Sequence, residues 1–169
     1  MSRPIKGTFP EYFERYTDLV KEDELLLAFK CQQEIIDNYF NSISEEKSTY
    51  AYAPGKWTIK DVLQHIIDTE RIFCYRALCI ARKETTSLPG FEEDDYAKNA
   101  NGNGRTWKDL VAELKAVRKA TEIMFNSFTK EMLEQSGISN NKAITVNAIG
   151  FIIPGHVIHH VNVLKERYF

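Results

Sequence analysis

The chain has 169 residues, of which 43% are hydrophobic and 27% charged, as is usual for one soluble globular domain with its own core. A formal net charge of -2 leaves no excess of lysine and arginine to neutralise a phosphate backbone, so nucleic acid is not expected as a partner. No apolar run reaches about 18 residues, so no membrane span is expected. The polar and aromatic stretch MSRPIKGTFPEYFERY lacks the apolar segment of a secretory signal, which predicts a cytoplasmic protein.

The first third of the chain predicts two helices. The shorter one lies around residues 10–19. The longer one runs from about Asp23 to Asn41, because apolar residues recur there at helical spacing. The members of this stripe are Leu26, Leu27, Cys31, Ile35, Ile36 and Phe40. The three cysteines at positions 31, 74 and 79 all lie in helix-like stretches and are predicted to be free, buried thiols.

A second long helix is predicted from about Ile59 to Lys83. Thr58 is a candidate N-cap, and Asp61 three residues later completes a capping box. One face of this helix carries the apolar stripe Val62, Ile66, Thr69, Phe73, Ala77 and Ile80. His65 lies beside this stripe, and it is the only histidine outside a C-terminal group of three.

Residues 85–105 form a long loop in this interpretation. The segment contains Pro89, Gly90, Gly102 and Gly104, together with the acidic run EEDD. Loops of this length are uncommon in compact domains and tend to be functional or disordered. The acidic run lacks the alternating ligand pattern of a calcium loop, so it is interpreted as a solvated face.

The last two long helices follow this loop. Thr106 caps the third, which runs to about Phe128, and a connection with a short helix leads to Thr145, which caps the fourth. Pro154 falls inside the fourth helix and predicts a mild kink rather than a break. With four long amphipathic helices, no strand-like alternation and no repeat, the sequence predicts an all-α four-helix bundle that forms a single domain over residues 1–169.

The fourth helix places histidines on an apolar face. Its inward stripe is Ile149, Ile153, His156, His160 and Leu164, so that two imidazoles lie one turn apart and can share a metal ion. A second stripe is nearly as good and pairs His156 with His159 instead. Periodicity favours His160 over His159 without deciding between them, whereas His156 belongs to both pairs.

His65 is the remaining histidine that could complete a metal site. It can do so only if its helix crosses near the middle of the fourth helix, which is how bundles usually build core sites. The alternative is that all three histidines are core residues hydrogen-bonded to neighbours. Because each buried, unsatisfied imidazole costs about 1–3 kcal/mol, one divalent ion that satisfies all three is the favoured interpretation.

Three stretches resemble a known family: GKWTIKDVLQHIIDTERIFCYRAL, LPGFEEDDY and GHVIHHVNVLKERY. In their order and spacing they resemble the DinB superfamily, specifically its YfiT-like branch, from about Phe9 to Tyr168. Members of this family are four-helix bundles in which three histidines, one from the second helix and two from the last, bind a divalent metal. The resemblance therefore implies that His65, His156 and His160 are the ligands.

A divalent ion on three neutral imidazoles keeps at least one open position, as in catalytic zinc sites. Such an ion could activate water for hydrolysis or hold a thiol as thiolate, and the resemblance implies both chemistries: a hydrolase, or a thiol S-transferase that uses a low-molecular-weight thiol. We therefore expect an enzyme that acts on a small molecule, with zinc or nickel as the favoured ion and a homodimer by analogy. The alternative is a non-catalytic metal-binding bundle with a stress-related or regulatory role.

Two further residues are candidates for the catalytic machinery. Asp68 lies three residues after His65 and could orient an imidazole, although it could equally be a surface charge paired with Arg71. His159 could carry protons at the mouth of the site, or it could be a solvated surface residue. Neither choice is decided by the sequence.

Overall fold

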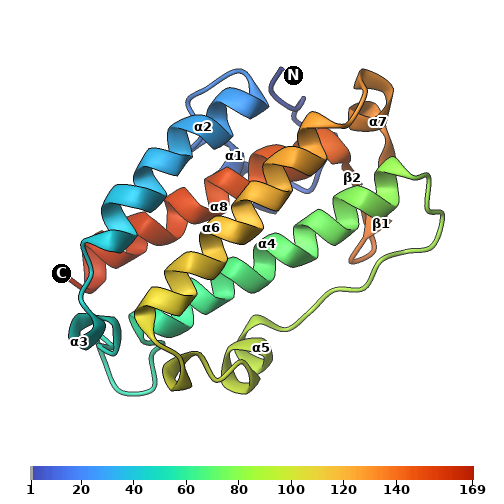
Figure 1. Ribbon diagram of the computed structural model, residues 1–169. Helices are drawn as coiled ribbons and strands as arrows, with labels where there is room; N and C mark the ends of the chain where they lie inside the picture. The colour runs from blue at the N-terminus through green and yellow to red at the C-terminus, as the bar shows by residue number, and fades with distance from the viewer. Residues whose placement is uncertain (1) are drawn as a thin grey trace.

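The computed structural model describes residues 2–169, and four long helices form its main body (Figure 1). These helices are α2 (Leu25–Ile35), α4 (Ile59–Ala81), α6 (Trp107–Asn126) and α8 (Val146–Arg167). Both α2 and α4 pack against α6 and α8, which closes the bundle. The predicted all-α four-helix bundle is confirmed. Within residues 2–169, no helix combines the length and the apolar character needed to cross a bilayer.

Short elements connect and flank these helices. The N-terminal helix is built from η1 and α1, and a π-helical turn, η2, extends α2. The short elements are η1 (Glu11–Phe13), α1 (Glu14–Thr17), η2 (Ile36–Phe40), α3 (Glu45–Ser48), α5 (Glu93–Asn99), η3 (Gly102–Gly104), α7 (Lys130–Glu134), β1 (Ser136–Ser139) and β2 (Lys142–Thr145).

Threonine caps fix where the long helices begin. The hydroxyl of Thr58 accepts a hydrogen bond from the backbone N–H of Asp61, whose carboxylate accepts one from the backbone N–H of Thr58, so the predicted capping box is confirmed. Thr106 and Thr145 cap α6 and α8 in the same way through their hydroxyl oxygens. Helix α8 continues through Pro154 without a break.

The connection between α7 and α8 differs from the prediction, because it contains a β-hairpin. Strands β1 and β2 are antiparallel, and Asn140 and Asn141 turn the chain with φ values of 48° and 60°. Each strand has only four residues, too few for an alternating pattern to be visible in the sequence. The hairpin is also tied to the preceding loop, since the backbone N–H of Leu88 donates to the carbonyl of Ile138.

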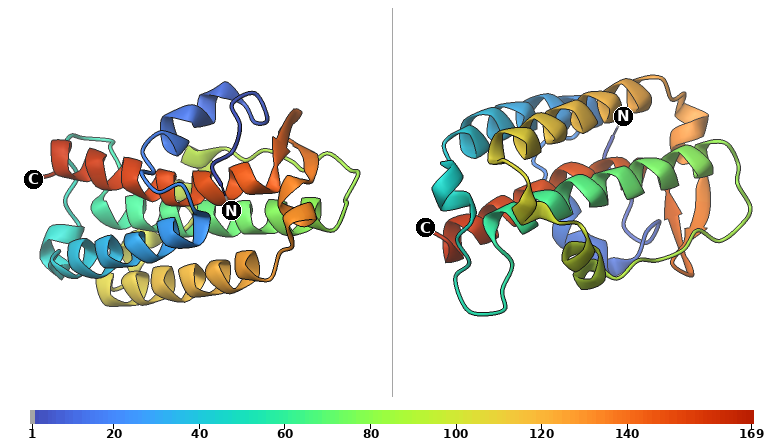
Figure 2. Two further views of the ribbon diagram at one scale, coloured as in Figure 1. Left: turned by 90° about the horizontal axis from the view of Figure 1, so that it is seen from above. Right: turned by 60° about the horizontal axis from the view of Figure 1, so that its bottom comes forward.

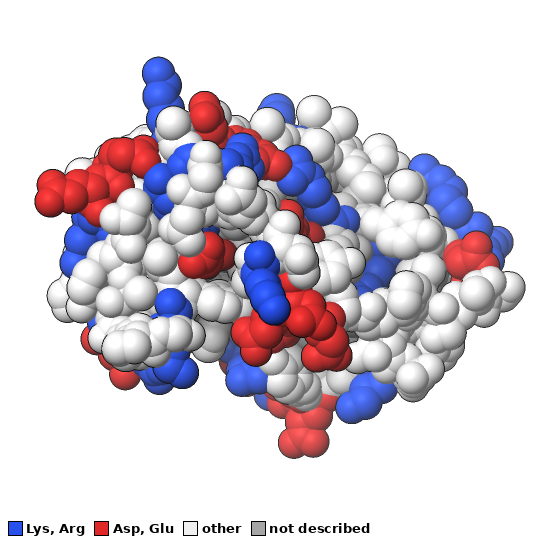
Figure 3. Space-filling view, turned by 90° about the horizontal axis from the view of Figure 1, so that it is seen from below, with Lys and Arg blue, Asp and Glu red and all other residues white. Residues whose placement is uncertain are grey.

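The segment at 85–105 is also more ordered than predicted. The acidic run starts α5, in which no residue is buried, so the interpretation as a solvated face is confirmed. Carboxylates are favoured in a first helical turn, where they meet the positive end of the helix dipole. Figure 3 shows the side of the molecule on which α5 lies in Figure 1, and acidic and basic side chains are interspersed there.

The buried face of α2 is rotated relative to the predicted stripe. Leu26, Leu27 and Cys31 are exposed, and the helix instead buries Leu25, Ala28, Phe29 and Gln32. The inward position of Gln32 explains the difference, because its side-chain oxygen accepts a hydrogen bond from the buried guanidinium of Arg118. All three cysteines are free, as predicted, but the predicted burial is wrong for Cys31, which is exposed, and Cys74 and Cys79 are only partly buried.

A polar layer crosses the middle of the bundle between two apolar clusters. On each long helix a buried polar residue separates members of one cluster from members of the other: Gln32, Glu70, Arg118 and His156. The Glu70 carboxylate binds the Arg118 guanidinium through two nitrogens, at 2.9 and 2.7 Å. A buried ion pair is tolerated when its other donors and acceptors are hydrogen-bonded as well. Here Gln32 accepts a hydrogen bond from Arg118, and the Thr121 hydroxyl donates one to Glu70.

Candidate metal centre

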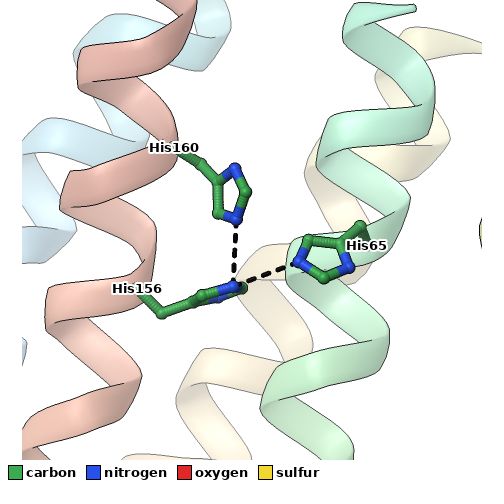
Figure 4. Close-up of side chains that lie close together, drawn as sticks. All are labelled: His65, His156 and His160. Atoms are coloured by element: carbon green, nitrogen blue, oxygen red, sulfur yellow. Dashed lines mark hydrogen bonds between the residues drawn. The ribbon is translucent and has the colours of Figure 1, made fainter. Parts of the chain in front are cut away.

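The imidazoles of three histidines converge between α4 and α8 (Figure 4). His65 comes from α4, and His156 and His160 come from successive turns of α8. The Nε2 atom of His156 lies 3.1 Å from Nε2 of His65 and 3.0 Å from Nε2 of His160. The structure therefore brings together the three residues that the sequence proposed as ligands.

The geometry of this cluster fits a small divalent cation. Two nitrogens that bind zinc at about 2.0–2.1 Å with tetrahedral angles lie roughly 3.4 Å apart, close to the two separations found here. With one ring nitrogen taken from each histidine, all three nitrogens lie within 4.8 Å of one another. Three imidazole nitrogens suit zinc, nickel, cobalt or iron, and they leave room for a further ligand.

Burial keeps these imidazoles neutral. It lowers the pKa of His65 from 6.5 to about 4, and it lowers the pKa values of His156 and His160 well below 6.5. The neighbouring imidazoles add to the effect at His156, because each would repel a second positive charge. Near pH 7 each ring is consequently neutral and keeps one nitrogen with a free lone pair. The neutral imidazole is the form that binds a metal.

Thr69, rather than Asp68, lies beside the imidazole of His65. The Thr69 hydroxyl is 3.5 Å from Nδ1 of His65, on the opposite side of the ring from Nε2. A proton on Nδ1 that points to this hydroxyl leaves the Nε2 lone pair facing the other histidines. The Asp68 carboxylate accepts a hydrogen bond from Gln64 at 3.0 Å, and burial raises its pKa. Arg71 forms its ion pair with Glu113, so the expected pairing with Asp68 is not found either.

His159 lies next to the cluster but outside it. Its ring is half-buried and packs edge-on against His160, with centroids 5.0 Å apart, and against Tyr16 at 5.3 Å. Burial lowers its pKa, and the positive charge of Arg15 lowers it further. The group of converging nitrogens contains His160 and not His159.

The N-terminal helix reaches this site because α8 has a glycine at the point of contact. A Cβ atom at Gly155 would lie 2.1 Å from the backbone oxygen of Tyr16, so only glycine permits this approach. The contact places the Tyr16 ring 5.3 Å from that of His156. The right-hand view of Figure 2 shows the N-terminal segment, α5 and the hairpin on the same side of α4.

A cleft of about 280 Å³ opens beside His156. Its walls are the N-terminal segment, α4, residues 90–93 and the hairpin. They contribute aromatic rings, two cations and one carboxylate: Tyr12, Tyr16, Phe73, Phe91, Arg76, Lys142 and Glu93. The volume is near the lower end of the roughly 300–1,000 Å³ typical of ligand pockets, and therefore suits a small molecule.

Sequence reasoning missed Thr69, Tyr16 and Arg76 as site residues. Thr69 had a visible signal, since it is one turn from His65 on the same helical face. Tyr16 and Arg76 had none: the packing of α1 against α8 brings Tyr16 to the site, and the cleft around Arg76 forms only where Pro89 and Phe91 pack against α4.

The comparisons with known proteins agree with this geometry. A model of the DinB superfamily matches residues 28–164 of the chain. This protein belongs to the DinB superfamily. A protein of Oceanobacillus iheyensis named as a candidate metal-dependent hydrolase is 23% identical over 126 residues, which are 74% of this chain and 72% of that one.

Two solved structures share the fold of this DinB-superfamily protein. YfiT from Bacillus subtilis, described as a candidate metal-dependent hydrolase with an unusual four-helix bundle topology, superimposes with a TM-score of 0.68 at 15% identity. That match covers 97% of this chain and 90% of YfiT. A mycothiol-dependent maleylpyruvate isomerase superimposes with a TM-score of 0.65 at 10% identity, over 81% of this chain and 58% of the isomerase.

Proposed function

We propose that this DinB-superfamily protein is a metal-dependent enzyme that acts on a small molecule. In this proposal one divalent ion, zinc or nickel, is held by His65, His156 and His160. The observation that carries the proposal is the approach of the three imidazoles, with Nε2 separations of 3.0 and 3.1 Å. A cleft that reaches one of these imidazoles gives a small molecule access to the site.

A bound divalent ion would supply Lewis acidity, which activates either a water molecule or a thiol. The protein's own residues prepare the site for this chemistry. Burial disfavours the charged form of the imidazoles, and the Thr69 hydroxyl oxygen can accept a hydrogen bond from Nδ1–H of His65, which leaves the Nε2 lone pair facing inward. Tyr16 and Trp57 cover the rings of His156 and His65 and restrict the approach of bulk water.

Hydrolysis is the first candidate reaction, and the name of the Oceanobacillus relative supports it. Transfer of a low-molecular-weight thiol is the second candidate, and the thiol dependence stated for the isomerase of similar fold supports it. In either reaction we assign proton transfer to His159, which is half-buried and in contact with the ring of His160. Asp68 receives no role, because its hydrogen bond goes to Gln64.

Turnover by the metal-loaded protein tests this proposal. Protein loaded with zinc or nickel would be assayed on ester and amide substrates, and on electrophiles supplied with a low-molecular-weight thiol. We expect activity in one of these two panels, its loss in His156→Ala, and an unchanged far-ultraviolet circular dichroism spectrum for that variant. If the protein binds the ion stoichiometrically but turns over no substrate in either panel, it is a non-catalytic metal-binding bundle and the enzymatic proposal is wrong.

A further inference from the structure

One buried cation in the cleft has no anionic partner. Only 7% of the surface of Arg76 is exposed, and among residues 2–169 no carboxylate lies within 4.0 Å of its guanidinium. Burial without a carboxylate lowers the pKa of this arginine. A buried charge is costly unless it is paired, and this arginine lines the cleft beside the histidine cluster.

The contacts of Arg76 leave most of its donors available. One nitrogen, Nη2, donates to the backbone oxygen of Pro89 at 2.7 Å, and a guanidinium has five N–H donors in total. The rings of Phe73 and Phe91 lie 5.7 and 5.8 Å from its central carbon, within the range of cation–π attraction. The guanidinium is therefore held in place by aromatic rings and one carbonyl, while its planar fork matches the geometry of a carboxylate.

The charges around the cleft set the charge of the ligand. Arg76 and Lys142 contribute two positive charges and Glu93 one negative charge, which leaves one positive charge in excess. The aromatic walls favour an apolar or aromatic body. We propose that the cleft binds a small monocarboxylate whose carboxylate is paired with Arg76 and whose apolar body lies between the aromatic rings, close to His156. This assignment names a substrate class and rests on the proposed function.

Arg76 could instead serve only to fix residues 88–92 to α4 through Pro89. That role requires one hydrogen bond to a carbonyl and would give no preference for a negatively charged ligand. Comparing a carboxylate with its neutral amide separates the two roles, because the two probes have nearly the same shape. Benzoate and benzamide suit the aromatic walls of the cleft.

The test is a binding titration of the metal-free protein, followed by NMR, with benzoate and with benzamide. Because no ion is present, a carboxylate cannot bind through the metal, and the result does not depend on whether the enzymatic proposal is correct. We expect benzoate to bind about tenfold more tightly than benzamide, in line with the strength of a charged hydrogen bond. We also expect benzoate to shift an arginine side-chain resonance that is missing in Arg76→Gln.

Three variants complete the experiment. Arg76→Gln should abolish the preference for benzoate, and Arg76→Lys should retain part of it. Arg82→Gln should retain all of it, because Arg82 follows the C-terminal end of α4 and does not line the cleft. Equal affinity for the two probes in the wild-type protein would overturn the proposal, even if Arg76→Gln fails to fold. A preference for benzoate that persists in a folded Arg76→Gln would also overturn it.

Discussion

At the scale of single residues, the sequence could predict the histidine cluster but not the rest of the site. Periodicity places His156 on the inner face of α8 whichever stripe is chosen, and it leaves the choice of partner open. The structure shows Nε2 of His160 3.0 Å from that of His156, with the ring of His159 turned toward Tyr16. The sequence gives no sign of Arg76, because the lack of a carboxylate beside its guanidinium is visible only in the three-dimensional structure.

Metal affinity distinguishes the two neighbouring histidines of α8. We expect His160→Ala to weaken zinc binding by about 100-fold or more. Removing a residue that only hydrogen-bonds to a metal ligand typically weakens binding about 10- to 100-fold, and removing a ligand itself should cost more. His159→Ala should change the affinity by less than about tenfold. Competition with a chromophoric chelator measures both values, and the opposite ranking of the two variants would show that His159 is the ligand.

At the scale of elements, caps and apolar periodicity located all four long helices. They could not locate the hairpin, whose strands are four residues long, or α5, whose residues are all accessible to solvent. The hairpin turn had a local signal in Asn140–Asn141, a pair that tolerates positive φ. Both missed elements lie beside the candidate cleft, so the walls of the site were less predictable than its histidines.

The contact between α1 and α8 makes Gly155 a critical position. Alanine normally stabilises a helix by about 1 kcal/mol relative to glycine. At position 155 we expect the opposite, a loss of about 1–3 kcal/mol, because the added methyl group meets the backbone of Tyr16.

Thermal unfolding and hydrogen exchange of the metal-free protein measure this effect. Exchange should become faster in residues 10–19 as α1 loses its contact with α8. Asn162→Ala, on the exposed side of the same helix, is the matched control and should leave both measurements nearly unchanged. A Gly155→Ala protein that is as stable as the wild type would show that α1 does not rest on α8 in this way.

At the scale of the whole molecule, the bundle places polar groups in its centre. In the polar layer, Gln32, Glu70 and Arg118 satisfy one another through hydrogen bonds and an ion pair. His156, the fourth member of the layer, instead contacts the imidazoles of His65 and His160, and His65 also contacts Thr69. An ion shared by these rings would therefore stabilise the fold as well as supply chemistry.

Buried neutral histidines make the metal-free protein sensitive to acid. In the unfolded chain an imidazole takes up a proton near pH 6.5, whereas in the folded protein His65 does so only near pH 4. The unfolded state thus binds more protons between these values, so stability falls as the pH falls from about 6.5 to about 4. The slope is at most about 1.4 kcal/mol per pH unit for each such histidine.

Denaturant unfolding of the metal-free protein at about pH 7, 6 and 5 measures this slope. His65→Leu, which has no titratable group, should reduce it. Stability that is constant between pH 7 and 5 would mean that the imidazoles are accessible to protons in the folded state.

The most direct test of the central claim is the amount of metal bound per chain after loading with zinc or nickel near pH 7 and removal of excess ion. His65 is the only member of the cluster on α4, so it decides whether two helices share the ion. We predict one ion per chain in the wild-type protein and almost none in a folded His65→Ala variant. Equal metal content in the two proteins, or none in either, would contradict the account.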